Sequence, residues 1–317
     1  MKSLTIISIV GVSVIAAHAQ QAATSPQTKK EKAAFTDPDS LSIFELIDSL
    51  INTPITGETG SSIVARLGYN SNIMSVNSGF AVNQFGLSPG VTYYHKSGLY
   101  VDAATYWSAE YSPSIFLSIP SLGYMKSIKK WTFNLEYSRY LYSYSSKGYG
   151  SPYTNSVSSS NFFDVKPFLF RLDYGFYFGD KNGHRIIPAI SLNLKKKNWL
   201  GLSQMYFYPT FSAMFGNDYW QDYRLFSNPT VRFKEGKPLF YLKNFSEFGI
   251  LDYYVSVPLT ISLKDWSFQA NYTYNFVQSL PGETLYSTNY GFLSFSIIKY
   301  FNFKTSNSLI DFYKLPK

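Results

Sequence analysis

The stretch LDYYVSVPLTISLKDWSFQANYTYNF, residues 251 to 276, decides the fold of this chain. It predicts two strands of ten or more residues, joined by a turn at Lys264-Asp265. Side chains along a strand alternate between its two faces, and here apolar residues alternate with polar ones, so each strand has one apolar face. Strands of soluble proteins usually have about five or six residues, whereas a tilted strand that crosses a bilayer has about ten. The pattern therefore predicts a hairpin of a transmembrane β-barrel. The apolar face of the first strand consists of Leu251, Tyr253, Val255, Val257, Leu259, Ile261 and Leu263.

The composition of the whole chain agrees with this prediction. Only 15% of its 317 residues are charged and 19% are aromatic, whereas a soluble domain typically has about 25% charged residues. The mean hydropathy of −0.11 excludes a bundle of membrane helices. Low charge with many aromatics is typical of a membrane barrel, in which only every second residue faces lipid. The chain has no cysteine, which excludes disulfides and thiolate metal sites.

The formal net charge is +8. A nucleic-acid-binding protein gathers such charge on one element of its structure. Here the lysines are scattered over predicted turns and loops, so the sequence predicts no nucleic-acid partner. They include Lys129, Lys130, Lys195, Lys196, Lys197, Lys234 and Lys237.

Residues 1–19 predict a secretory signal peptide. Lys2 provides the positive charge, Leu4–Ala17 the apolar region, and Ala17-His18-Ala19 the small-residue cleavage site. The alternative is an N-terminal membrane anchor, although the apolar region is shorter than the roughly 20 residues that a helix needs to span a bilayer. The mature protein is therefore expected to leave the cytoplasm.

Residues 20–60 predict a periplasmic linker that contains one short amphipathic helix, residues 39–52. Ser42 and Glu45 form a capping-box pattern at its start. In one interpretation this helix packs against the barrel mouth or a neighbouring loop. In the other it is a plug, or a docking peptide for a periplasmic or envelope protein partner. Its apolar residues recur at helical spacing: Ile43, Leu46, Ile47 and Leu50.

From residue 61 to residue 303 the periodicity of two predicts an antiparallel barrel of about twelve strands, followed by a C-terminal tail, residues 304–317. A Ser/Tyr/Gly-rich loop is predicted at 145–161. One strand, at 219–227, is predicted only because an additional strand is needed to place the Lys264-Asp265 turn at the same end of the barrel as the other short turns. The other strands are predicted at 61–70, 85–95, 99–107, 115–126, 131–138, 168–178, 185–194, 200–215, 251–263, 266–276 and 288–303.

The turns give the barrel an orientation. Outer-membrane barrels have short periplasmic turns and longer external loops. The turns at 95–98, 128–130 and 179–184 are short, and the last of them contains the hairpin signal Asn182-Gly183. We therefore expect these turns and Lys264-Asp265 to face the periplasm, together with both ends of the barrel.

Three tryptophans are predicted to form interfacial belts. Trp131 and Trp266 each follow a predicted periplasmic turn, and Trp107 lies near the opposite end of its strand. Aromatic side chains gather at both surfaces of the membrane in proteins of this kind. The alternative is simple aromatic packing in a soluble β-sandwich, which would not favour strands of this length.

Several segments also carry a resemblance. The segments SLSIFELIDSLI, RLGYNSN, GLSPGVTYYHKSGLYVD and FGILDYYVSVPLTISL resemble those of a Bacteroidetes-type family of outer-membrane β-barrel proteins over residues 39–303. The resemblance implies the architecture and an outer-membrane location, and it supplies no activity or site residues. The last residue of the chain is not the aromatic residue typical of such proteins, because a tail follows Phe303.

The polar faces of the strands provide the candidate site. They would line the lumen of the barrel, and Asp252 is expected near its outer end. Two hypotheses stay open: a narrow aqueous path with a constriction of mixed charge, or a network of ion pairs and hydrogen bonds that fills the lumen. The candidate lining residues are Arg66, Asp102, Glu136, Arg171, Asp173, Asp252 and Asn271, with Asn134, Gln269 and Asn275.

The sequence contains no pattern for catalysis or metal binding. His18 is removed with the signal peptide, and His95 and His184 fall in predicted periplasmic turns, away from any nucleophile or ligand at suitable spacing. We therefore predict that the protein is not an enzyme and has no cofactor.

The predicted function is a diffusion pore or a substrate-selective channel for small polar solutes in the outer membrane. The alternative is a structural or docking component of a cell-envelope complex, with a filled lumen and a partner bound through residues 39–52. Outer-membrane lipid is the other expected partner.

Overall fold

The computed structural model describes residues 61–71, 73–74, 81–82, 86–109, 112–143, 153–225, 240–281 and 289–303. All of them belong to one compact unit, Ala33–Lys317. The predicted signal peptide, residues 1–19, the linker 20–60 with its helix 39–52, and the tail 304–317 lie outside the described residues. None of the described residues forms a helix long and apolar enough to cross a membrane.

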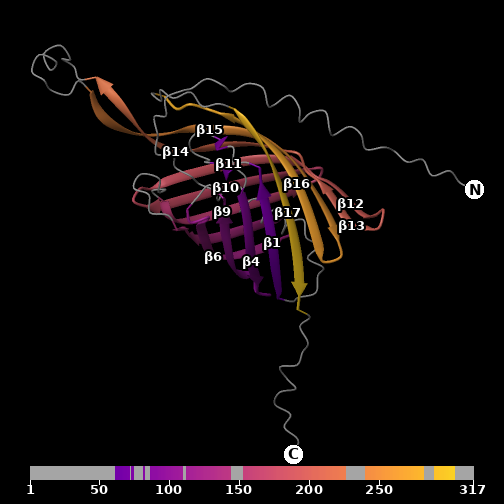
Figure 1. The fold of residues 1–317 in the computed structure, drawn as a ribbon. Helices are drawn as coiled ribbons and strands as arrows, with labels where there is room; N and C mark the ends of the chain where they lie inside the picture. Colours follow the sequence, from indigo (N-terminus) through magenta and orange to yellow (C-terminus); the bar gives the residue numbers. More distant parts are fainter. Residues whose placement is uncertain are drawn as a thin grey trace, which may run out of the picture. The chain divides into compact units, whose positions relative to one another are not determined.

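Twelve antiparallel strands of the described chain form one closed barrel (Figure 1). Each strand pairs with the next one along the chain. The barrel is closed by nine residue pairs between β1 and β17, from Ser62↔Asn302 to Asn70↔Ser294. The twelve strands are β1 (Ser62–Asn70), β4 (Gly86–Tyr94), β5 (Leu99–Trp107), β6 (Ile115–Ile128), β7 (Trp131–Arg139), β9 (Tyr153–Val165), β10 (Phe168–Gly179), β11 (Gly183–Leu192), β14 (Thr210–Leu225), β15 (Phe240–Leu263), β16 (Trp266–Val277) and β17 (Tyr290–Asn302).

Short strands extend this barrel. β12 (Leu194–Trp199) continues β11, and β13 (Leu202–Phe207) precedes β14; together they form a hairpin whose β13 pairs with the end of β15. β8 (Leu141–Tyr142) continues β7 along β6. A separate small hairpin consists of β2 (Ile73–Met74) and β3 (Ala81–Val82).

The two ends of the barrel differ. One end, called the turn end below, carries the compact turns at 95–98, 129–130, 166–167, 200–201 and 264–265. β1 begins and β17 ends at this same end, since Ser62 pairs with Asn302. The opposite end, called the loop end, carries the turn at 180–182. The turn at Lys264-Asp265 and both barrel termini therefore share one end, as the sequence predicted.

The predicted strand count is correct, but two of the predicted segments are wrong. Residues 153–165, placed largely in a loop, form β9, which pairs with β7 and β10. The separate strand predicted at 219–227 does not exist, because β14 continues to Leu225 and pairs directly with β15. β9 was missed because its sequence is rich in serine, so hydrophobic alternation is weak.

Because β9 was not predicted, the turn after β10 was predicted at the wrong end of the barrel. With β9 in place, the turn after β10 lies at the loop end, so the prediction that residues 179–184 and His184 share one end of the barrel with the Lys264-Asp265 turn is wrong. His184 is exposed there, and its Nδ1 lies 2.9 Å from the Tyr174 hydroxyl. His95 is at the turn end, as predicted, where its Nδ1 lies 2.8 Å from Ser97 Oγ.

Leu251 faces inward, in contrast to its predicted outward position. The register between β14 and β15 shifts between Met214 and Phe215, which pair with Asp252 and Ile250. Such a β-bulge inserts one extra residue and turns it to the other face. Leu251 is buried with Met214 and Tyr254, while the alternation from Asp252 onward follows the prediction.

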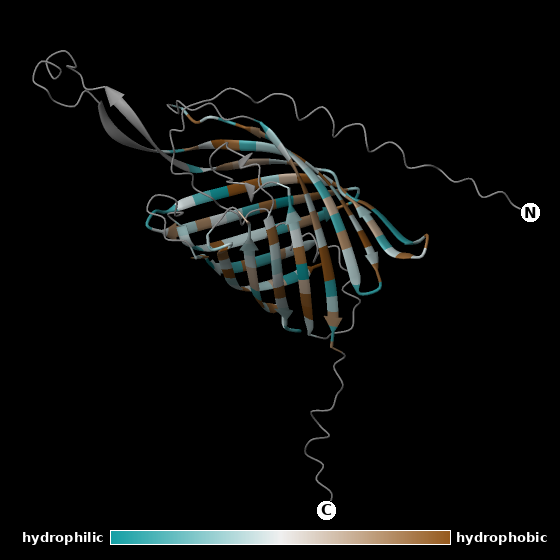
Figure 2. Ribbon diagram, viewed as in Figure 1, coloured by the Kyte–Doolittle hydropathy of each residue, from teal (hydrophilic) through white to brown (hydrophobic). Residues whose placement is uncertain are grey.

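The outer face of the barrel is an exposed apolar surface. Along β10, Phe168, Phe170, Leu172 and Tyr174 are 42–46% exposed, and the residues between them are buried. Figure 2 shows the alternation of hydrophobic and hydrophilic residues along the strands. Soluble monomers rarely expose contiguous apolar patches of more than a few hundred Å². Each of the twelve barrel strands pairs with two neighbours, so the barrel with this apolar outer face is suited to lipid as its solvent.

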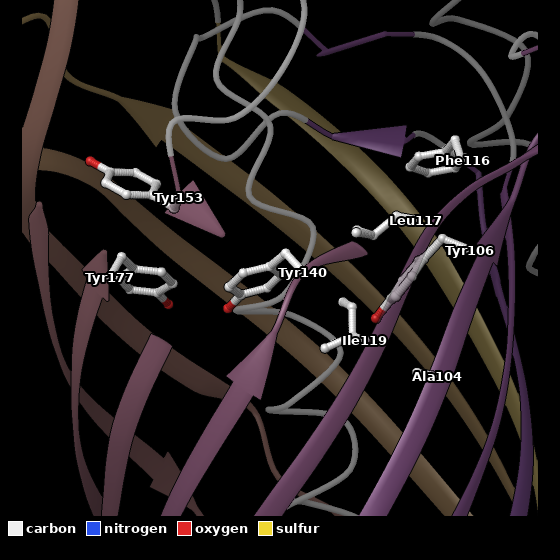
Figure 3. Packing of buried hydrophobic residues seen from close by; sticks show 8 residues of the cluster. All are labelled: Ala104, Tyr106, Phe116, Leu117, Ile119, Tyr140, Tyr153 and Tyr177. Atoms are coloured by element: carbon white, nitrogen blue, oxygen red, sulfur yellow. The ribbon is translucent and has the colours of Figure 1, made fainter. Parts of the chain in front are cut away.

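The inner face carries a hydrophobic cluster near the loop end (Figure 3). It comes from β5, β6, β9 and β10 and from Tyr140, which follows β7 and whose hydroxyl lies 2.8 Å from Ser156 Oγ. These side chains pack the interior near the loop end, whereas the buried polar residues Asp102, Glu136 and Arg171 lie closer to the turn end in the same part of the barrel. The cluster consists of Ala104, Tyr106, Phe116, Leu117, Ile119, Tyr140, Tyr153 and Tyr177.

Candidate functional site

An ion pair between β1 and β5 lies on the inner wall of the barrel. Arg66 donates from Nη1 and Nη2 to the two carboxylate oxygens of Asp102, each at 2.7 Å. The Thr92 hydroxyl, on β4 between them, donates to Asp102 Oδ1 at 2.5 Å and accepts from Arg66 Nη1 at 2.7 Å. A bidentate guanidinium–carboxylate pair is among the strongest hydrogen-bonded arrangements in proteins.

A glycine makes this ion pair possible. Gly90 is the residue of β4 directly opposite Arg66. A Cβ atom at Gly90 would lie 2.6 Å from the Arg66 Cζ. The guanidinium therefore passes over the glycine of the neighbouring strand to reach Asp102 on the strand beyond it.

The side chain of Tyr100 likewise crosses one strand, since it extends from β5 over β6 to β7. Its hydroxyl donates to Glu136 Oε2 and lies 3.0 Å from Asn134 Oδ1. Ser138 donates to the other Glu136 oxygen at 2.8 Å. The ring of Tyr100 lies over Gly123 of β6, the pairing partner of both Tyr100 and Glu136. Glu136 is thus held at the wall by hydrogen bonds and is only 3% exposed.

A second polar group of the inner wall consists of residues on β10 and β15. Arg171 Nε lies 3.0 Å from Asp173 Oδ2, both on β10. Arg171 Nη2 lies 3.4 Å from the hydroxyl of Tyr254 on β15, although β11 and β14 separate these two strands. On β16, Gln269 donates from Nε2 to the Tyr208 hydroxyl at 3.0 Å.

The remaining predicted lining residues lie apart from these groups. Asp252 is 5% exposed and lies opposite Met214 and Val277, near the loop end. Asn271 is half-buried and donates to Thr273 Oγ1 at 3.1 Å, and Asn275 is buried. The structure therefore brings Arg66 together with Asp102 and Arg171 with Asp173, and leaves Asp252 and Asn271 separate.

Arg185 is a lining residue that the sequence analysis missed. It is 3% exposed on β11 and donates from Nη1 to the backbone carbonyls of His184 and Asn217, at 3.0 and 2.5 Å. It also lies over a glycine, Gly216. Arg185 lies on the same face of β11 as Ile187 and Ala189, which are both buried, and this alternation could have identified it from the sequence. With Arg185 included, three arginines and four carboxylates line the described wall: Arg66, Arg171, Arg185, Asp102, Glu136, Asp173 and Asp252.

Trp131 and Trp266 lie on the outer surface near the turn end, 37% and 43% exposed. The Trp131 ring stacks on Phe163, with centroids 6.2 Å apart. Lys299 Nζ lies 4.9 Å from the Trp266 ring centroid and 3.5 Å from Asp265. Trp107 is the last residue of β5, at the loop end, and it is half-buried.

The described residues contain no group of three or more histidine, aspartate or glutamate side chains placed to hold a metal ion. The two histidines of the barrel lie at opposite ends. The lining residues described above offer hydrogen bonds and charge.

The closed strand pairing, the exposed apolar outer wall and the polar inner wall define an integral membrane protein of the outer-membrane β-barrel class. No protein-family model matches the chain. No curated protein sequence is detectably similar to it.

Among solved structures, three porins are similar in fold. A NanC porin is 13% identical, with a TM-score of 0.40, and the match covers 75% of this chain and 99% of that one. OmpF of Salmonella typhi, in complex with daunomycin, is 9% identical with a TM-score of 0.31, covering 76% and 97%. A porin refined at 1.8 Å resolution is 9% identical with a TM-score of 0.29, covering 76% and 99%. These values assign no family, so the fold rests on the strand pairing described above.

Proposed function

We propose that the protein is a narrow diffusion channel of the outer membrane for small polar solutes. One observation carries the proposal: twelve strands close into a barrel whose inner wall bears charged and hydroxyl groups while its outer wall is apolar. Barrels of eight strands are filled by their own side chains and those of sixteen enclose open channels, so twelve strands correspond to a lumen of intermediate width. Membership of the Bacteroidetes-type barrel family is part of the same proposal.

The charges of the wall define the kind of solute. The lining carries both signs, and Arg66 is neutralised by Asp102. A constriction with paired charges discriminates weakly between anions and cations, in contrast to a ring of one sign. Neutral polar solutes and zwitterions therefore match this lining best, because they can exchange water for hydroxyl and carboxylate contacts without a net charge to compensate.

Planar-bilayer conductance tests the channel. Purified, folded protein should give small, discrete conductance steps. In the variant Arg66→Gln, Asp102 loses its counter-charge, so the reversal potential in a salt gradient should shift toward cations. The exposed turn variant Asp265→Asn is the matched control and should leave the reversal potential unchanged. Absence of steps from barrels that remain folded would contradict the proposal.

A second candidate function is a structural component of an envelope complex with a filled lumen. The bonds among Arg66, Asp102 and Thr92, and among Tyr100, Glu136 and Ser138, favour it, since wall side chains that bond to one another also rigidify a barrel. Deletion of residues 39–52, followed by gentle solubilisation and co-purification, separates the two functions. Loss of a co-purifying protein without a change in conductance would support the structural role.

A further inference from the structure

The lysines that are scattered along the sequence gather at the turn end of the barrel. Among the described side chains, this end carries ten lysines and only two acidic residues, Asp164 and Asp265. The loop end is balanced, with Arg139 and Lys181 against Asp180 and Glu247. The turn-end lysines are Lys96, Lys126, Lys129, Lys130, Lys166, Lys195, Lys196, Lys197, Lys264 and Lys299.

These lysines lie next to the aromatic residues of the outer wall. Trp131 directly follows Lys130, and Trp266 follows the turn of Lys264. Lys299 Nζ lies over the Trp266 ring, with 4.9 Å to the centroid, which places a cation at the level of an interfacial tryptophan. Because such tryptophans lie at the level of the lipid head groups, the lysines around them reach the phosphate layer.

The β12–β13 hairpin carries the densest part of this charge. Lys195, Lys196 and Lys197 are consecutive and exposed on β12, which extends beyond the turn of β9 and β10. Partial shielding lowers the pKa of Lys195, and the positive charges of Lys197 and Lys166 lower it further, opposed only by Asp164. An anion placed among these amines would relieve their mutual repulsion.

The tip of the same hairpin is apolar. Leu200 is 79% exposed, the largest value among the exposed hydrophobic residues described, and Trp199 beside it is 37% exposed. Lys196 Nζ lies 4.7 Å from the centroid of the Trp199 ring. Tryptophan, an apolar side chain and lysine together are the combination that membrane proteins present to the lipid head groups.

We propose that the turn end is a binding surface for anionic phospholipid head groups, with the β12–β13 hairpin as its main contact. Lipid fits better than an acidic protein or a nucleic acid, since four of the five described turns contain a lysine, the fifth joins the lysine-bearing β12 to β13, and the aromatic residues of the membrane interface accompany them. A macromolecular partner would contact one side of the barrel, whereas lipid surrounds it. Each lysine near an anionic surface adds to the attraction between the protein and the membrane.

Quenching of tryptophan fluorescence tests this surface. The full-length barrel is reconstituted into liposomes that contain brominated phosphatidylglycerol or brominated phosphatidylcholine at equal bromine content. We expect phosphatidylglycerol to quench more strongly, and the preference to fall as salt is added. The variant K195S/K196S/K197S should lower the relative affinity for phosphatidylglycerol about fivefold or more. The matched variant R139S/K181S, at the loop end, should retain it.

Two results would overturn the proposal. Equal quenching by the two lipids in the unmodified protein would exclude an anionic-lipid surface, and binding of poly-glutamate by the same liposomes would then assign the lysines to an acidic protein. An unchanged preference in the triple lysine variant, with the barrel still folded, would exclude the hairpin as the main contact.

Discussion

Tyr100 lies across Gly123 and bonds to Glu136 on the next strand. Arg66 repeats this relationship, because it lies across Gly90 and bonds to Asp102. In both cases a long side chain crosses one strand where that strand has no Cβ. The glycines therefore direct these side chains along the wall of the barrel and not toward its axis.

The first prediction concerns Gly123. In the variant Gly123→Ala, the new methyl group would lie 2.3 Å from the Tyr100 Cζ, so the tyrosine must leave Glu136 or the strands must separate. We expect a loss of about 1–3 kcal/mol in the free energy of unfolding, as for other overpacked sites. Urea unfolding in lipid vesicles measures it. Gly249→Ala is the control, since only the tip of Leu280 lies near that position, and an equal loss in both variants would contradict the prediction.

The second prediction concerns Arg66 and Asp102. Asp102→Asn removes the charge that compensates a guanidinium with 14% side-chain exposure. Removing one partner of a buried ion pair typically costs about 3–5 kcal/mol, whereas replacing both by apolar residues costs much less. The double variant Arg66→Met with Asp102→Leu should therefore be more stable than Asp102→Asn alone. A double-mutant cycle with additive effects would show that the two residues are not coupled.

The sequence predicted the outer wall of the barrel well and its inner contacts poorly. Apolar alternation marks most of the lipid-facing strands, as along Phe168, Phe170 and Leu172, so the class of fold followed from it. β9 was not predicted because polar residues, Ser159 and Asn161, occupy outward positions where apolar residues are expected. The missed strand compensated for the strand wrongly predicted at 219–227, which is why the count was nevertheless correct.

The pairing of lining residues depends on register, which alternation alone does not determine. Arg66 and Asp102 are 36 residues apart and meet only because β1, β4 and β5 are aligned by particular turns. A shift by two residues would keep every face correct and separate the ion pair. The inward orientation of Leu251 depends in the same way on a bulge that no residue pattern marked.

The third prediction concerns the orientation of the barrel. The chain contains no cysteine, so single cysteines can be introduced at Lys181, in the loop-end turn, and at Lys129, in a turn-end turn. A membrane-impermeant maleimide should label Lys181→Cys in intact cells and Lys129→Cys only after the outer membrane is permeabilised. The opposite pattern would place the short turns outside.

The fourth prediction concerns the depth of the tryptophans. In variants that retain a single tryptophan, Trp131 and Trp266 should be quenched more strongly by nitroxides at the head-group level than by nitroxides deep in the acyl chains. Leu172→Trp, in a tryptophan-free background, is the control near the middle of β10 and should show the reverse order. Deep quenching of Trp131 or Trp266 would move the membrane boundary toward the turns.

Trp107 lies at one end of the outer wall and Trp266 at the other. The distance between these two levels constrains the thickness of the surrounding bilayer. Every strand of the barrel is hydrogen-bonded on both sides, so the height between the two levels is fixed, and no strand can change its tilt alone. A bilayer of another thickness must therefore stretch or compress around the protein, at a cost of fractions of a kcal/mol for each ångström of mismatch. Neighbouring barrels that share one deformed annulus would reduce this cost, which favours their lateral clustering.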